Sequence, residues 1–246
     1  MAFTHLHVHT EYSLLDGSNK IKEYVRRVKE LGMDSAAITD HGVMYGVIDF
    51  YKACRAEGIR PILGCEVYVA PNSRFDKELT GGDDRYYHLV LLAENNTGYN
   101  NLTRIVSRGF TEGYYYKPRV DMELLQEFHE GIIALSACLA GEVQRYITKG
   151  LYDEAKKTAL KYQACFGKGN YFLELQDHGL PEQKMVNTAL LQMSKELDIP
   201  LVATNDVHYT YKEDVKPHDI LLCLQTGKKL ADEDRMRYVG GQYYVK

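Results

Sequence analysis

Short apolar runs alternate with amphipathic helical patterns along the whole chain, and this alternation constrains the fold more than any other feature. A parallel sheet is favoured, because each crossover connection must pack back across the strands that it joins. The pattern also predicts that the long helical span 142–165 breaks into two helices near Gly150. Strands are expected at residues 3–9, 35–39, 61–70, 87–93, 131–136, 171–175 and 201–204, and helices at 20–31, 47–56, 98–107, 142–165, 182–197 and 214–224.

The leading architecture is an α/β fold in the form of a distorted, TIM-like (β/α)7 barrel, and a doubly wound open sheet is the alternative. Both place a ligand site at the carboxyl ends of the strands. The barrel is expected to occupy residues 1–226. Residues 227–246 have weak periodicity and are expected to form a tail that leads toward a further module, and residues 71–84 are expected to form an exposed loop.

Composition limits the class of protein. With 246 residues, 45% of them hydrophobic and 26% charged, the chain can bury the core of one large domain. No apolar run approaches the roughly 20 residues that span a bilayer, and no secretory signal is recognisable, so a cytoplasmic protein without membrane contact is expected. Five cysteines without a Cys-x-x-Cys pair indicate reduced thiols, and a net charge of −4 argues against duplex binding by phosphate neutralisation alone. An isolated domain of this kind is expected to be monomeric.

Histidines and acidic residues gather where the expected strands end. In His5-Leu-His7-Val-His9 the three imidazoles share one face of a strand, because side chains alternate across it. His7 and His9 are expected to enter a site and His5 to lie deeper in the core. Asp206-Val-His208 repeats this spacing after the last expected strand. A metal role and a structural role are comparable alternatives for such a pair.

A second set of polar residues marks the central strands. Asp40 and His41 follow a buried strand directly, and turn chemistry explains the aspartate better than the histidine. Glu66 interrupts an apolar run, where a lone carboxylate is costly unless it is paired or binds metal. A ligand role is favoured for Glu66.

Three further candidates have plainer alternatives. Asp16 precedes a helix and, taken alone, is better explained as a turn or capping residue. His88 opens an apolar strand, and Cys138 follows one, where a buried core thiol is the simpler interpretation. Cys138 shares the strand-end position of the other candidates.

Imidazole, carboxylate and thiolate ligands together suit Zn²⁺, Mn²⁺ or Fe²⁺, and Mg²⁺ fits them less well. So many ligands can hold two or three ions. Closely spaced ions lower the pKa of a bridging water from about 16 toward 7 and clamp the attacking and leaving oxygens of a phosphate ester. Phosphate ester hydrolysis is therefore the expected reaction, and the sequence has no G-x-S-x-G, Walker A or G-x-G-x-x-G motif that would favour another.

The loop 113–119 combines three tyrosines with Lys117 and Arg119. Such a loop could stack a base and hold a phosphate. The alternative, a solvated loop whose tyrosines pack on the barrel, has equal weight.

The ordered candidates resemble the metal-binding signature of the polymerase-and-histidinol-phosphatase (PHP) family. The resemblance spans nearly the whole chain and implies a distorted seven-stranded barrel with three metals at the carboxyl ends of the strands. It makes Asp40 a neighbour of the ligands and assigns catalysis to all of the ligands except Cys138. The implied metal ligands are His7, His9, Asp16, His41, Glu66, His88, Cys138, Asp206 and His208.

Longer segments resemble bacterial polymerase III alpha subunits. They are His7-Val-His-Thr-Glu-Tyr-Ser-Leu-Leu-Asp-Gly17, Asn95-Asn-Thr-Gly-Tyr-Asn-Asn-Leu102, Tyr115-Tyr-Lys-Pro-Arg-Val-Asp121 and Ala203-Thr-Asn-Asp-Val-His208. This resemblance implies 3′-5′ exonuclease proofreading, in which metal-bound hydroxide attacks the terminal phosphodiester of a DNA 3′ end, next to a polymerase module that this chain lacks. A phosphomonoesterase of the histidinol-phosphate phosphatase type and a catalytically silent, metal-stabilised scaffold are the alternatives.

Overall fold

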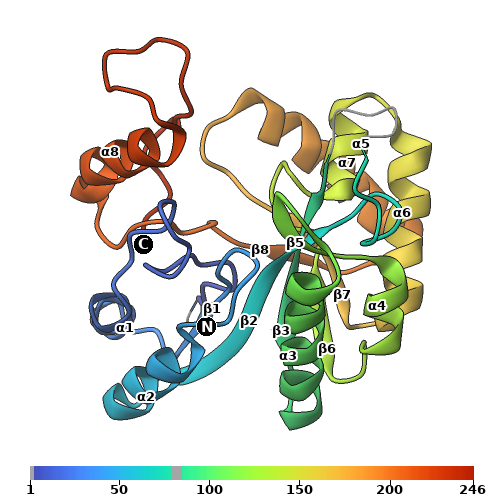
Figure 1. The fold of residues 1–246 in the computed structure, drawn as a ribbon, viewed down its shortest axis with the longest axis horizontal. Coiled ribbons are helices and arrows are strands. Elements are labelled where there is room, and N and C mark those ends of the chain that lie inside the picture. The colour runs from blue at the N-terminus through green and yellow to red at the C-terminus, as the bar shows by residue number, and fades with distance from the viewer. Residues whose placement is uncertain (1–2, 79–84) are drawn as a thin grey trace.

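The computed structural model describes residues 3–78 and 85–246, and within them its elements follow the predicted alternation closely (Figure 1). The predicted break near Gly150 is confirmed, since one helix ends at Thr148 and the next begins at Tyr152. The strands are β1 (Ser35–Ile38), β2 (Arg60–Val69), β3 (Tyr87–Ala93), β4 (Tyr114–Tyr115), β5 (Lys117–Val120), β6 (Ile132–Leu135), β7 (Tyr171–Leu175) and β8 (Leu201–Ala203). The helices are α1 (Ile21–Glu30), α2 (Val47–Glu57), α3 (Asn96–Thr111), α4 (Met122–Glu127), α5 (Glu142–Thr148), α6 (Tyr152–Phe166), α7 (Pro181–Leu197) and α8 (Val215–Thr226), with a 3₁₀ turn at Lys212–Asp214.

The strands form one curled, mixed sheet in the order β4-β5-β2-β3-β6-β7-β8, and β1 pairs with the first half of β2. The prediction of a wholly parallel sheet is wrong at β3, which runs antiparallel to both β2 and β6. A parallel neighbour requires a crossover segment of about a dozen residues or more, usually a helix. No helix lies in the described part of the segment between β2 and β3, so β3 returns directly beside β2.

The reversed direction of β3 decides where His88 lies. In a parallel strand, the first residues would lie at the sheet edge remote from the carboxyl ends. In the antiparallel register, His88 instead pairs with Tyr68, near the carboxyl end of β2. His88 therefore reaches the same edge as the residues that follow the parallel strands.

The strand expected at residues 3–9 does not form as a ladder. Val8 makes an isolated parallel bridge to Val207, after β8, and on its other side its backbone pairs with Thr39, after β1. The Thr39 hydroxyl accepts the hydrogen bond from the backbone N–H of Val8, so a side chain replaces the backbone acceptor that a regular ladder would supply. The N-terminal segment thus lies between the chain after β8 and the chain after β1, and the described strands stop short of a closed seven-stranded barrel.

The two faces of the sheet bury different residues because side chains alternate along each strand. On the convex face, Cys65, Val67 and Leu91 pack with α3 to α7 in the largest core. On the concave face, Val90 and Leu92 form a small apolar floor with residues of β6. Glu66 pairs with Val90 on this same concave face, so the floor supports the polar site from below.

Two short elements and one terminal segment were not expected. The hairpin β4–β5 turns at Tyr116, which has a φ of 64°, and α4 is capped by the Asp121 side chain, which accepts a hydrogen bond from the N–H of Leu124. Residues 238–245, predicted to belong to a tail, pack back on the domain: Val245 is fully buried, and Tyr244 makes a bridge to Tyr209.

The loop expected at 71–84 forms no helix or strand over 71–78, and its remaining residues lie outside the described part of the chain. None of the described helices is long and apolar enough to cross a bilayer.

Candidate metal centre

Glu66 lies at the centre of a buried cluster on the concave face of the sheet. It is 1% exposed, and imidazoles from three different segments surround its carboxylate. The Oε2 atom lies 2.7 Å from His41 Nδ1, and the Oε1 atom lies 3.0 Å from His88 Nδ1 and 3.2 Å from His7 Nε2. One carboxylate in β2 thus links the N-terminal segment and the loop after β1 to the start of β3.

Asp206 and Asp16 extend the cluster on the side of β8. Asp206 Oδ1 lies 3.2 Å from the Nε2 atoms of both His7 and His9. Asp16 Oδ2 lies 2.8 Å from His41 Nε2 and 3.7 Å from His208 Nε2. Asp206 thus contacts His9, and Asp16 contacts His41, whose ring stacks 4.0 Å from that of His9.

Cys138 completes the set at the end of β6, where its Sγ lies 3.8 Å from His88 Nδ1 and 4.0 Å from Glu66 Oε1. The structure thus brings all nine sequence-predicted ligand residues together. Three overlapping groups have ligand atoms within 4.8 Å of one another, and these are His9 with His41 and His208, His7 with His9 and Glu66, and His41 with Glu66 and His88.

Several buried atoms of the cluster lie close to oppositely charged groups but, among the described residues, make no hydrogen bond of good geometry. Burying a polar atom without a partner is costly, so an orphaned group calls for an explanation such as a bound ion. The atoms are imidazole nitrogens and carboxylate oxygens that converge, which is the donor set of a site for several divalent cations. The orphaned atoms are His7 Nε2, His9 Nε2, His41 Nδ1, Glu66 Oε2 and Asp206 Oδ1.

Hydrogen bonds behind the cluster fix the orientation of the rings. His7 Nδ1 lies 2.7 Å from Glu174 Oε1, and His9 Nδ1 lies 3.0 Å from Ser13 Oγ. Ser13 in turn donates to Asp40, which also accepts from the backbone and hydroxyl of Thr10. Such partners orient metal-binding imidazoles and raise their basicity. Asp40 therefore lies behind His9, as the predicted neighbour of the ligands.

The cluster changes the ionisation of its members. Burial favours the neutral ring of His41, but Glu66 and Asp16 outweigh it and raise the pKa of His41 to about 10. Burial also favours a neutral carboxyl at Glu66, yet His88, His7 and His41 hold the pKa of Glu66 well below its ordinary range. Burial raises the pKa of the Cys138 thiol. The carboxylates are thus ionised, and the surrounding imidazoles balance their charge. Bound cations would take over this role of counter-charge.

Two backbone positions at the cluster adopt the left-handed conformation without being glycine. Asp206 has a φ of 44° and Ala137, next to Cys138, has a φ of 65°. Such residues cost about 1–3 kcal/mol each and persist where the surrounding structure fixes them, often at functional sites. The chain turns sharply after β6 and β8 at these residues.

A comparison with protein families identifies the fold that carries this cluster. The model of the PHP domain matches residues 5–178, which is most of the chain and includes seven of the nine clustered residues. The chain belongs to the PHP family. This PHP domain is also similar to curated proteins named "DNA polymerase III subunit alpha", with 51% identity in Treponema pallidum over 100% of this chain, 48% in Deinococcus radiodurans over 99% and 44% in Thermus aquaticus over 100%. The chain spans about a fifth of the length of these relatives, 21%, 19% and 20% respectively.

Solved structures share the fold at low sequence identity. A putative metal-dependent phosphoesterase from Bifidobacterium adolescentis superposes with a TM-score of 0.53 at 15% identity, covering 83% of this chain and 87% of that one. An amidohydrolase from Chromobacterium violaceum gives a TM-score of 0.55 at 14% identity, covering 85% and 88%. The curled α/β architecture of the PHP domain is therefore shared with these hydrolase structures.

Sequence reasoning missed two residues at the site. Glu174 is a buried carboxylate in the apolar strand β7, the same signal that singled out Glu66. Tyr238 comes from the segment predicted to be a tail, and its hydroxyl donates to Asp16 Oδ1 at 3.2 Å and lies 3.1 Å from His208 Nε2. No local pattern in the sequence points to Tyr238, because its contact with Asp16 spans 222 residues.

Replacing Glu174 with glutamine tests the role of the groups behind the ligands. Glu174 Oε1 bonds to His7 Nδ1 and accepts from Gln176 and from the Thr204 hydroxyl. The amide keeps the shape but removes the charge that favours the metal-binding form of His7. We expect metal affinity to fall about 10- to 100-fold, measured by competition with a chromogenic chelator. Glu142→Gln, on the outer side of the domain beside Tyr162, is the matched control, and equal affinity in both variants would contradict the role of Glu174.

The two cations of the loop 113–119 have different surroundings. Arg119 is 4% exposed, and its guanidinium donates to the backbone carbonyls of Gly113, Arg74 and Asp76. It is therefore committed to holding the loop together, and the prediction that it contacts phosphate is corrected. Lys117 is partly exposed in a cleft that includes Asp16 and His41, so only Lys117 remains a candidate.

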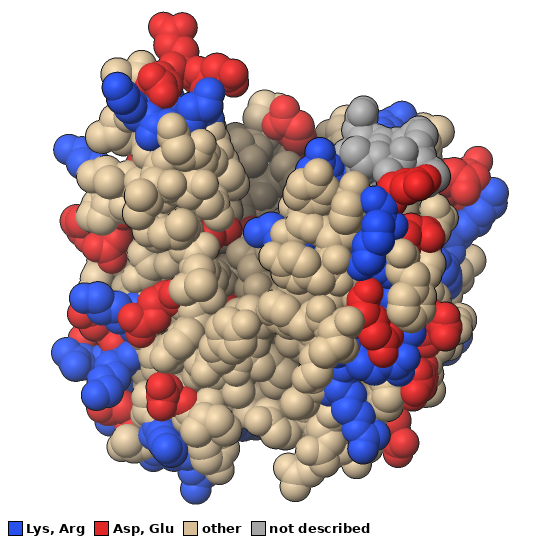
Figure 2. Space-filling view, in the orientation of Figure 1, with Lys and Arg blue, Asp and Glu red and all other residues tan. Residues whose placement is uncertain are grey.

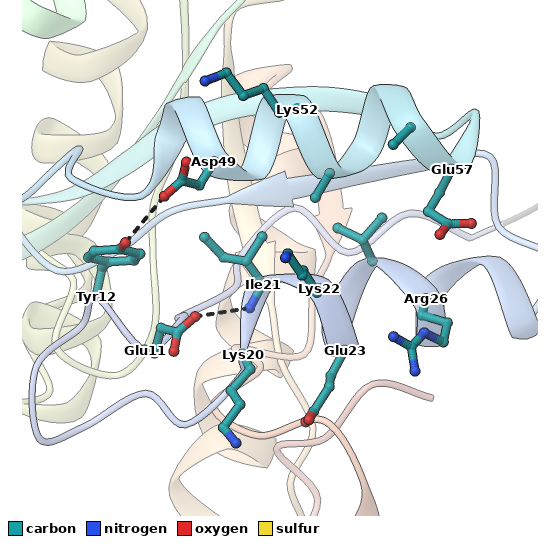
Figure 3. A pocket seen from close by; sticks show the side chains of 13 residues that line it. Glu11, Tyr12, Lys20, Ile21, Lys22, Glu23, Arg26, Asp49, Lys52 and Glu57 are labelled. Carbon is teal, nitrogen blue, oxygen red and sulfur yellow. Dashed lines mark hydrogen bonds between the residues drawn. The ribbon is translucent and has the colours of Figure 1, made fainter.

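A larger groove lies elsewhere, between α1 and α2, with a volume of about 790 Å³ (Figure 3). Four basic and four acidic side chains line it, and Tyr12 and Glu11 make the hydrogen bonds drawn there to Asp49 and to the N–H of Ile21. Its charges balance and no cluster of histidines faces it. The groove therefore lacks the donor set of the metal centre.

Proposed function

We propose that this PHP domain is the metal-dependent phosphoesterase module of a bacterial DNA polymerase III alpha subunit and that it hydrolyses the terminal phosphodiester at DNA 3′ ends. The observation that carries the proposal is the convergence of nine ligand-type residues from positions 7 to 208: six share the three ligand groups, and Asp16, Cys138 and Asp206 contact them. The similarity to alpha subunits over the whole chain supports the choice of a DNA substrate.

Two or three divalent ions of Zn²⁺, Mn²⁺ or Fe²⁺ would be held by His7, His9, Asp16, His41, Glu66, His88, Cys138, Asp206 and His208. Bound ions supply a hydroxide-like nucleophile at neutral pH and neutralise charge on the phosphate. The protein's part is to bind the ions and to orient the groups that hold them. Glu66 belongs to two of the three ligand groups and has two carboxylate oxygens, so it could serve more than one ion, whereas His9 would offer its single free nitrogen, Nε2.

The surroundings of the centre support an exonuclease over an endonuclease. The Asp16 and His41 side chains are only 9% and 14% exposed, and Tyr238 lies against Asp16 from the C-terminal segment. Such a recessed centre admits a chain end more readily than the middle of a duplex. In a complete alpha subunit, the polymerase module would supply that end in the bacterial cytoplasm.

The test is hydrolysis of a 5′-labelled single-stranded DNA by the purified domain with Mn²⁺ or Zn²⁺. We expect single-nucleotide shortening from the 3′ end that EDTA abolishes and added metal restores. Turnover of a phosphomonoester with no DNA shortening would indicate a small-molecule phosphatase instead. A protein that binds metal but hydrolyses neither substrate would indicate a structural role.

A further inference from the structure

A cleft of about 290 Å³ opens directly onto the metal centre, with Asp16 and His41 in its wall. Figure 2 shows a hollow between the surface over α8 and the surface over β4 and β5, lined mainly by uncharged side chains. Six aromatic residues from five segments line the cleft, and Asp16 is the single acidic residue among its described lining residues. The aromatic residues are Tyr12, Tyr45, Tyr68, Phe110, Tyr114 and Tyr116.

Three of these rings are strongly exposed in the free domain. Tyr45, Tyr114 and Tyr116 expose 60%, 56% and 59% of their surface. Phe110 connects two of them, with ring centres 6.5 Å from Tyr45 and 6.2 Å from Tyr114. A contiguous row of exposed aromatic side chains beside a reactive centre indicates a surface that a ligand covers.

Cations lie close to these rings. The Lys117 ammonium lies 5.4 Å from the centre of the Tyr68 ring, and that ring stacks 6.0 Å from His41. The Arg85 guanidinium lies 4.3 Å from the centre of the Tyr116 ring. A lysine between an aromatic row and the metal centre can neutralise a phosphate that lies between a stacked base and the reacting atoms.

We infer that this cleft binds the unpaired 3′-terminal nucleotides of single-stranded DNA, with bases stacked on Tyr45, Tyr114 and Tyr116 and a backbone phosphate beside Lys117. The inference rests on the proposed function and names its substrate class. Stacking requires exposed base faces, which an unpaired end offers and a duplex end largely hides. The net charge of −4 also leaves little basic surface for holding a duplex, so base stacking must supply much of the affinity.

The first test measures binding alone, in EDTA, by fluorescence anisotropy of a 5′-labelled ten-residue oligothymidylate. The same strand with abasic residues at its last two 3′ positions and a blunt duplex of equal length are the comparison probes. We expect the intact single strand to bind more tightly than either. Equal affinity for the intact and abasic strands would overturn the inference.

The variants Tyr45→Ala, Tyr116→Ala and Lys117→Ala then locate the contact. Loss of one stacked base is expected to weaken binding roughly 5- to 100-fold, and the phenylalanine variants should restore most of it. The matched control is Tyr51→Ala, which removes a tyrosine that is 45% exposed on α2 and lies outside the cleft. Unchanged affinity in all three cleft variants would overturn the inference.

A second readout separates this inference from the proposed function. The bound metal content should be unchanged in the Tyr45 and Tyr116 variants, because neither residue belongs to the metal cluster, and hydrolysis of bis(4-nitrophenyl) phosphate with Mn²⁺ is measured on the unaltered domain. If the variants lose neither DNA affinity nor DNA hydrolysis, the cleft inference fails while the proposed function stands. If the domain hydrolyses no phosphodiester but binds the intact strand in preference to the abasic one, the proposed function fails while the cleft inference stands.

Discussion

Replacing His9 or Asp206 with alanine is expected to abolish metal-dependent hydrolysis and to remove most of the bound metal. His9 Nε2 lies 3.2 Å from Asp206 Oδ1 and 3.4 Å from Glu66 Oε2, and within the described part of the chain neither His9 Nε2 nor Asp206 Oδ1 makes a hydrogen bond of good geometry. Each substitution therefore removes a ligand atom from the middle of the cluster. Even residues behind the ligands change metal affinity 10- to 100-fold when they are replaced. We therefore expect each of these substitutions to lower metal affinity by more than about 100-fold.

The bound metal of the purified variants is measured by elemental analysis, and their rates of hydrolysis of single-stranded DNA are measured in parallel. His129→Ala is the matched control, because His129 follows α4, is exposed, and its ring hydrogen-bonds to the Gln126 carbonyl outside the cluster. Asp206→Asn adds a variant of nearly the same shape that lacks the charge. Full metal content in His9→Ala and Asp206→Ala together would contradict the assignment of the cluster as a metal centre.

Removing metal is expected to lower the melting temperature of the domain by about 10 °C. The cluster buries the carboxylates of Glu66, Asp206 and Asp16, and cations that bind only the folded state stabilise it by mass action. At a metal concentration about 1,000 times the dissociation constant, one site contributes about 4 kcal/mol, and about 1 kcal/mol shifts the melting temperature of a domain of this size by about 2–4 °C.

This effect is measured by calorimetry of the domain with EDTA and then with stepwise additions of Zn²⁺ or Mn²⁺. His9→Ala should show little shift, because it lacks a residue that belongs to two of the three ligand groups. Identical melting curves with and without metal in the unaltered domain would contradict the prediction. A full shift without any hydrolysis would favour the structural role over the enzymatic one.

The sequence by itself determined most of the elements and the identity of the clustered residues. Strands as short as β7 were recognisable because apolar runs flanked by turn residues have a local signal. The pairs His7-x-His9 and Asp206-x-His208 were visible because alternation along an extended chain places both side chains on one face, whatever the rest of the fold does. Glu66 stood out because a carboxylate in a buried strand needs a partner.

Only the tertiary structure decided the direction of β3, and with it the access of His88 to the centre. Strand direction depends on what the connecting segment packs against, which no local pattern records. The same reason explains why the role of Arg119 was mispredicted and Tyr238 was missed: Arg119 is buried by carbonyls up to 45 residues away, and Tyr238 reaches Asp16 across 222 residues. Contacts between distant segments depend on the packing of the whole chain, and they determined which polar residues lie in the candidate metal centre, which lie behind it and which line the cleft.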